Sequence, residues 1–376
     1  MRHLGLVVTI VLGGAGCNNI LGIDTLNLRD GGEADAAIDA PAVCYGTYLK
    51  ACYGQVPTGT LDLAGTLNTD TDTHCTTVHQ TNGPDVCAIA GATVTITGDL
   101  VVAGSRPLML VATGAITVSN KLDASSKDQN NQIGPGANSV LCTGPVNGSP
   151  SAVVTGGAGG AAGGSFISIG GGGGAGNGGG AGAAVTASAV QQTTILRGGC
   201  AGGAGGTNAG TGGGAGGAGG PGGGAIYLVS QQAITITNEL RASGAGGRHS
   251  AALDAGGGGG GSGGMIVLEA PQITMSGSGQ IVANGGGGGE GSRDQAGVDG
   301  DDDKNWDSTP GGGSSQSDSG NGGNGAFRTT AATNGTNGGG GGGGGAGAGG
   351  GGGGLGAVRV HGPFNGTTVS PSATTF

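Results

Sequence analysis

The chain has 376 residues, of which 100 are Gly and 12 are Pro, and this Gly and Pro content lies at the boundary of low-complexity sequence. Four Tyr, four Phe and one Trp offer few large anchors for a core, and 13 basic against 23 acidic residues give a net charge of −10. The chain lacks a basic patch that could neutralise phosphates, which argues against nucleic acid as a partner. The glycines fall in blocks between short aliphatic runs, so the hydrophobic core is smaller than the length suggests.

The N-terminus has the pattern of an export signal. A basic start precedes an apolar run from Leu4 to Leu12, which is too short to span a bilayer. The following GAGC, ending at Cys17, resembles the lipobox of bacterial lipoproteins, with Gly14 where that family usually has an aliphatic residue. The resemblance implies that Cys17 carries a lipid that holds the protein on a membrane. The alternative is an ordinary secretory signal that leaves Cys17 as a thiol.

The number of cysteines fits an exported protein. Removing Cys17 from the seven cysteines leaves an even set, which suggests disulfides. The first four are expected to staple a small N-terminal knot and the last two to close a Gly-rich loop, although six cysteines permit 15 pairings. A metal site around His74 and His79 is the alternative, but no Cys pair has the spacing of a zinc knuckle. The disulfide candidates are Cys44, Cys52, Cys75, Cys87, Cys142 and Cys200.

An internal repeat is the most informative pattern. Leu108 to Ser125 (LMLVATGAITVSNKLDAS) aligns without a gap with Ile226 to Ser243 (IYLVSQQAITITNELRAS). A third copy begins at Met265, and partial copies occur at Thr93 to Gly104 and at Ala357 to Val360. Apolar residues alternate within each copy, as in strands with one buried face.

Near-identical short units must stack to share a core. We therefore expect an all-β fold, a short parallel β-solenoid of about four rungs, with a β-sandwich as the structural alternative. The expected divisions are a signal peptide at 1–16, lipid attachment and a flexible tether at 17–41, a Cys-rich region at 42–90 and the solenoid at 91–376. Gly-rich insertions are expected within the solenoid at 126–224, 245–264 and 286–356. They should leave the stack and return to it on one side.

The Gly-rich insertions contain GGA and GGX triplets and resemble the PGRS segments of mycobacterial cell-surface proteins. A three-residue repeat suits packed polyproline-II-like strands, because Gly allows close backbone approach. A flexible coil is the alternative.

Four segments together resemble a group of glycine-rich surface lipoproteins of myxobacteria. They are the Cys17 region, the Cys-rich region, LRGGC ending at Cys200 and GGMIVL ending at Leu268. This resemblance implies an outer-membrane or cell-surface location, or otherwise secretion, and implies no catalytic activity.

Catalytic motifs are weak. The many G-x-G-x-x-G matches lack a following helix, and GGSGG around Ser262 lacks the strand-to-helix context of a nucleophile elbow. No rung is expected to stack carboxylates beside Arg or Lys. Because parallel β-helices often carry polysaccharide lyases, a secreted carbohydrate-active enzyme (lyase or hydrolase) remains the second hypothesis, by analogy of fold.

An acidic cluster from Glu290 to Asp307 carries half of the net charge. Asp299, Asp301 and Asp303 begin like an EF-hand loop, but Lys304 replaces the Gly of the sharp turn. The cluster is a candidate for weak calcium binding, with a solvated loop as the alternative.

If the aligned isoleucines point inward, hydroxyl residues point outward in two columns. Thr is also simply a good exposed strand residue, but such columns resemble the Thr arrays of β-helical ice-binding proteins and could bind a repetitive polymer such as an envelope polysaccharide. The first column contains Thr95, Thr117, Thr235 and Thr274, and the second contains Thr97, Ser119, Thr237 and Ser276. The function expected is that of a non-catalytic structural or adhesive lipoprotein of the cell envelope.

Overall fold

The computed structural model describes residues 42–376 except 129–130, 181, 192–193, 210–213, 303 and 340–343. The described residues form an all-β structure without helices, in which nearly all strand pairs are parallel. The expected signal peptide, Cys17 and the tether lie outside the described residues, as does Asp303.

A seven-stranded sheet takes one strand from each repeat. Its central strands β5, β7, β10, β13 and β16 pair in parallel, whereas β4 pairs antiparallel with β5. Its members are β4 (Thr76–Val78), β5 (Val86–Gly91), β7 (Leu108–Ala112), β10 (Ala225–Ser230), β13 (Met265–Glu269), β16 (Ala357–His361) and β19 (Thr374–Thr375).

A ten-stranded sheet takes the other strands of each repeat, in two ladders that share the long strand β6 (Thr93–Ala103). One ladder, hereafter the second ladder, comprises β3 (Thr60–Asn68), β6, β8 (Ile116–Val118), β11 (Ile234–Ile236), β14 (Ile273–Met275) and β17 (Phe364–Asn365). The other, hereafter the third ladder, continues from β6 through β9 (Leu122–Asp123), β12 (Glu239–Arg241), β15 (Gln280–Val282) and β18 (Val369–Ser370).

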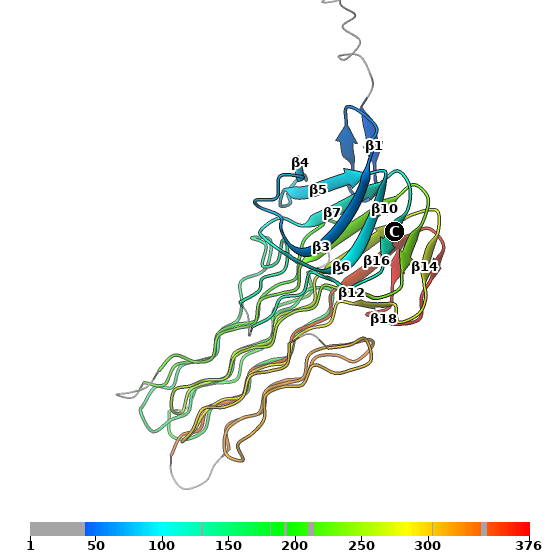
Figure 1. Cartoon of the computed structure of the whole chain (residues 1–376). Helices are drawn as coiled ribbons and strands as arrows, with labels where there is room; N and C mark the ends of the chain where they lie inside the picture. The colour runs from blue at the N-terminus through cyan, green and yellow to red at the C-terminus, as the bar shows by residue number, and fades with distance from the viewer. Residues whose placement is uncertain are drawn as a thin grey trace, which may run out of the picture. The chain divides into compact units, whose positions relative to one another are not determined.

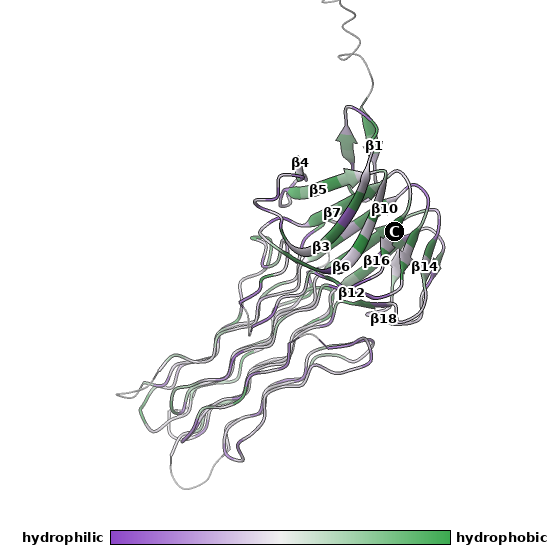
Figure 2. Ribbon diagram, viewed as in Figure 1, coloured by the Kyte–Doolittle hydropathy of each residue, from purple (hydrophilic) through white to green (hydrophobic). Residues whose placement is uncertain are grey.

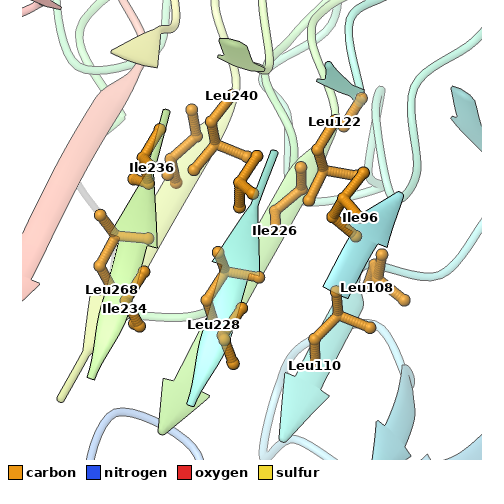
Figure 3. Packing of buried hydrophobic residues seen from close by; sticks show 14 of the residues in the cluster. Ile96, Leu108, Leu110, Leu122, Ile226, Leu228, Ile234, Ile236, Leu240 and Leu268 are labelled. Carbon is orange, nitrogen blue, oxygen red and sulfur yellow. The ribbon is translucent and has the colours of Figure 1, made fainter. Parts of the chain in front are cut away.

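The pairing confirms the register read from the repeat. Ile226 lies opposite Leu108, and Ile234 lies between Ile116 and Ile273 on neighbouring strands. The third copy and the copy at Ala357 pair in the same way. The inward side chains of the two sheets form one aliphatic core (Figure 3), in which Ile96, Leu110, Leu122, Ile236 and Leu240 are almost fully buried.

The alternation with one buried face holds for β8 and β11, but it is wrong for β7 and β10, which are buried on both faces. The outward face of the seven-stranded sheet, around Tyr227 and Val267, is covered by a second apolar cluster that includes Phe166 and Leu196. Continuous apolar runs such as LMLVA and AIYLV are typical of strands covered on both sides.

The first four cysteines pair with one another in the N-terminal region, as expected, but the two disulfides lie in different sheets and do not form one separate knot. Disulfide Cys44–Cys52 staples an antiparallel hairpin of β1 (Val43–Tyr45) and β2 (Ala51–Tyr53), whereas Cys75–Cys87 ties β4 to β5 within the large sheet. The third disulfide joins Cys142 to Cys200, as expected. The Cys-rich region thus shares the sheets of the repeats, because β3 and β5 supply the first partners of β6 and β7.

The Gly-rich insertions leave after β9, β12 and β15 and extend on one side of the strands (Figure 1). Their backbone hydrogen bonds recur every third residue, as in Gly157, Gly160 and Gly163 donating to residues 177, 174 and 171. Three residues per turn is the period of a polyproline-II helix. This regular bonding supports the packed arrangement expected from the triplets. In Figure 2 these segments are mostly pale, and the hydrophobic residues concentrate on the strands.

Residues 256–264 form the centre of this glycine bundle and are all buried. Their N–H groups donate to three neighbouring segments, and the carbonyls of residues 256–262 accept from three others. These six neighbours lie within residues 158–164, 199–206, 217–223, 242–248, 286–289 and 348–354. A Cβ on Gly258 would lie 2.0 Å from the carbonyl oxygen of Ala218, so the close approach requires glycine there.

Candidate functional site

The outer face of the second ladder carries the predicted hydroxyl column. Thr95, Thr117, Thr235 and Thr274 lie in register on four neighbouring parallel strands, and each is partly exposed. Asp62 on β3 and Asn365 on β17 extend the column at its two ends. Because the flanking isoleucines point into the core, these six polar side chains share one face.

The second predicted column is less uniform, because Thr97 lies within β6 whereas Ser119, Thr237 and Ser276 directly follow β8, β11 and β14. Thr97, Ser119 and Ser276 are exposed. The hydroxyl of Thr237 is 3.3 Å from the carbonyl oxygen of Val118, to which the Thr237 N–H also donates. One hydroxyl of this column therefore already bonds the backbone.

The calcium candidates contact a histidine and a lysine side chain. Asp299 Oδ1 is 2.6 Å from His249 Nδ1, and Asp301 Oδ1 is 3.3 Å from Lys304 Nζ. Asp301 also accepts a bond from the Gly311 N–H. Across the part of the chain that the structure describes, no group of three or more His, Cys, Asp or Glu side chains could hold a metal ion. His74 and His79 pair with Asp72 and Asp85, and Cys75 is in a disulfide.

Glu290, from the same acidic cluster, is buried and holds the following loop. Its carboxylate accepts bonds from the N–H groups of Val298, Ser315 and Gln316 and from the hydroxyls of Ser315 and Ser319. Burial acts to raise the pKa of Glu290, but the hydrogen bonds outweigh it and the pKa is lowered. The residue is a structural anchor of the bundle.

The sequence reading missed a group of charged residues on the third ladder, hereafter the charged seam. It comprises Asp123, Lys127, Glu239 and Arg241. Asp123 is fully buried and lies in register beside Arg241, and its carboxylate is 2.5 Å from Lys127 Nζ. Arg241 Nε is 2.9 Å from Glu239 Oε2. The expectation that no rung would place carboxylates beside Arg or Lys is therefore wrong. The repeat alignment itself carried the signal, since LDAS aligns with LRAS.

A pocket of about 640 Å³ opens between the N-terminal hairpin and the carboxyl ends of β10, β13 and β16. Glu269 and His361, neighbours on β13 and β16, line it with Tyr45 and Gln231. Glu269 Oε2 accepts bonds from the Tyr227 hydroxyl and the Thr47 N–H. Burial, followed by the bond to Glu269, raises the pKa of Tyr227 well above its ordinary range. The pocket thus presents a carboxylate beside an imidazole.

No protein-family model matches this chain, and neither a curated protein nor a solved structure shows significant similarity to it. In the described residues, no helix has the length and apolar character needed to cross a membrane. Three disulfides are typical of an oxidising, extracellular environment.

Proposed function

We propose that this protein is a non-catalytic, lipid-anchored component of the cell envelope, with a structural or adhesive role, and that it binds a repetitive polysaccharide along the hydroxyl column. The observation that carries the proposal is the in-register row of Thr95, Thr117, Thr235 and Thr274. Neighbouring strands lie about 4.8 Å apart, which is close to the length of one sugar unit in an extended polysaccharide. A row of hydroxyls at that spacing can form hydrogen bonds to successive sugar units of the polymer.

The architecture suits such a role. We infer that the seven-stranded sheet, the second ladder and the third ladder are the three faces of a short parallel β-solenoid of about four rungs, in which each repeat contributes one coil. Stacked coils keep the hydroxyl groups of the column in fixed positions, so little side-chain entropy is lost on binding. The hydrogen-bonded glycine bundle acts as a rigid extension from the same body, in keeping with a structural component.

Attachment through Cys17 is part of the proposal. Its support is the apolar run followed by GAGC and the even cysteine set that remains. Cys17→Ser should release the protein from membranes and abolish incorporation of labelled palmitate. A variant that stays with the membrane fraction, together with wild type that takes up no label, would overturn the anchor.

The binding test uses the full chain and polysaccharide extracted from the envelope of the source organism. Thr235→Trp and Thr274→Trp together should weaken binding at least about tenfold, which corresponds to about 1.4 kcal/mol. Thr329→Trp is the matched control, because Thr329 is exposed in a turn and lies on none of the strands that carry the hydroxyl column. Unchanged affinity in the double variant would exclude the hydroxyl column as the binding surface.

The charged seam favours a second candidate, a carbohydrate-active enzyme. Glu239 is partly exposed beside Arg241 and close to the buried Asp123, which places carboxylates beside a cation. Release of new reducing ends or unsaturated sugars that Glu239→Gln abolishes would favour the enzyme. Saturable binding without any release would favour the adhesin.

A further inference from the structure

Arg197 is a buried cation in contact with a disulfide. It is 2% exposed, and its Nη1 lies 3.3 Å from Cys142 Sγ and 3.4 Å from Cys200 Sγ. Its other contacts are the backbone oxygens of Gly198 and Gln191, the Gln191 side-chain oxygen and the ring of Phe166. Among the described residues no carboxylate forms an ion pair with it, so none of them supplies a counter-ion for its charge in the oxidised protein.

A thiolate at Cys200 would supply that counter-ion. An adjacent cation lowers the pKa of a thiol, and a thiol of low pKa leaves faster in thiol–disulfide exchange. The other two disulfides have no Arg or Lys nitrogen in contact with sulfur, as far as the described residues show. Arg197 therefore favours breakage of this bond over the other two.

The two sulfurs differ in access. Cys200 is 2% exposed at the base of the bundle, whereas Cys142 is partly exposed and follows the fully exposed Val140. The Cys142 N–H donates locally to the Ser139 carbonyl, and the backbone ties between this loop and the segment before Cys200 lie earlier in the loop, where the Asn138 N–H donates to the Gly199 carbonyl and the Gly136 carbonyl accepts from the Gly198 N–H. An incoming thiolate can reach Cys142 without disturbing the bundle.

We propose that Cys142 is a thiol-exchange site for low-molecular-weight thiols, with Cys200 as the leaving group and Arg197 as the group that stabilises it. The incoming thiolate, its proton already given to solvent, forms a bond to Cys142 Sγ. The Cys142–Cys200 bond breaks, and its electron pair remains on Cys200 Sγ beside the guanidinium. A second thiol that attacks the mixed disulfide completes the two-electron reduction and leaves as the oxidised thiol dimer.

The order of reduction in the wild-type protein tests the proposal. The full chain is treated with limiting reduced glutathione, free thiols are alkylated, and adducts are located by mass spectrometry. Glutathione should appear first on Cys142, with Cys200 free. Cys44 and Cys52 are both exposed, so access alone would make their disulfide react first. That order, or an adduct on Cys200, would overturn the proposal.

The role of Arg197 has its own test. Arg197→Gln should slow adduct formation on Cys142 by about threefold or more, Arg197→Lys should restore much of the rate, and the surface control Arg248→Gln should not change it. In the Cys142→Ser variant, the thiol pKa of Cys200, followed by thiolate absorbance, should lie below about 8.5, the value of a free cysteine. A pKa at or above that value would refute stabilisation by Arg197, whatever the variants do to stability.

Discussion

Asp123 on β9 lies directly beside Arg241 on β12, at positions that correspond to each other in the repeat. Opposite charges on neighbouring strands attract each other, whereas the same charge at both of these positions would cause repulsion between the two strands. Asp123 is fully buried and also contacts Lys127. The copies of the repeat are therefore not interchangeable at this point of the core edge.

The first prediction concerns this buried carboxylate. Asp123→Ala removes the carboxylate beside Lys127 and Arg241 and should lower the free energy of unfolding by about 2 kcal/mol. The loss should be smaller than for a fully buried ion pair, because the Lys127 side chain is 26% exposed. Denaturant unfolding measures the change. Asp62→Ala, at an exposed strand edge, should have little effect. A similar loss in both variants would contradict the argument.

The second prediction concerns the core column. Ile234 is fully buried, so Ile234→Asp places an unpaired charge in the core and should cost several kcal/mol, of order 4. Thr235→Asp, one residue away on the outer face, should cost less than about 1 kcal/mol. Thermal unfolding of both variants provides the comparison, and equal destabilisation would rule out the assignment of the two faces.

The third prediction concerns close packing in the glycine bundle. Gly258→Ala forces a Cβ to within 2.0 Å of the Ala218 carbonyl oxygen and should destabilise the protein by about 3 kcal/mol or more. Gly344→Ala has open space around the new Cβ and should change stability by less than about 1 kcal/mol. If Gly258→Ala were harmless, the hydrogen-bonded packing of residues 256–264 would be wrong.

The fourth prediction concerns the pH dependence of Glu290. Its pKa is lowered in the folded protein, so its stabilising contribution is present above the ordinary Glu range of about 4.3 and is lost as the pH falls through the lower folded value. Glu290→Gln should therefore be less stable than wild type at pH 7, and the difference should shrink below about pH 4. Unfolding measured between pH 3 and 7 tests this, and a difference that grows on acidification would have the wrong sign.

The fifth prediction compares two tyrosines near the hairpin. The Tyr53 hydroxyl is buried and finds no hydrogen-bond partner among the residues that the structure describes, and burial raises its pKa to about 12. Tyr53→Phe should leave stability at neutral pH unchanged or raise it, and should remove part of the stability loss of wild type between about pH 10 and 12, where the unfolded chain ionises first. Tyr227→Phe removes the bond to Glu269 and should cost about 1 kcal/mol or more. A larger loss in Tyr53→Phe than in Tyr227→Phe would contradict this reading.

Much of the strand register was readable from the repeat. Apolar residues that recur with period two and in near-identical copies have one efficient way to share a core, which is to stack in parallel with equivalent residues side by side. Ile234 beside Ile116, and Thr235 beside Thr117, follow from that alignment alone. The three-residue hydrogen-bond period of the insertions also followed from local composition, because only Gly permits such close backbone approach.

The neighbours of each glycine segment depended on the tertiary structure. Glycine carries no side chain to select a partner, so the six neighbours of residues 256–264 are set by where the strand ends place each insertion. The same long-range placement brings Phe166 and Leu196 over the outer face of the seven-stranded sheet, Arg197 against the Cys142–Cys200 disulfide, and Gln316 to the carboxylate of Glu290. These contacts join residues far apart in sequence through burial and hydrogen bonding, and no local pattern of residues encodes them.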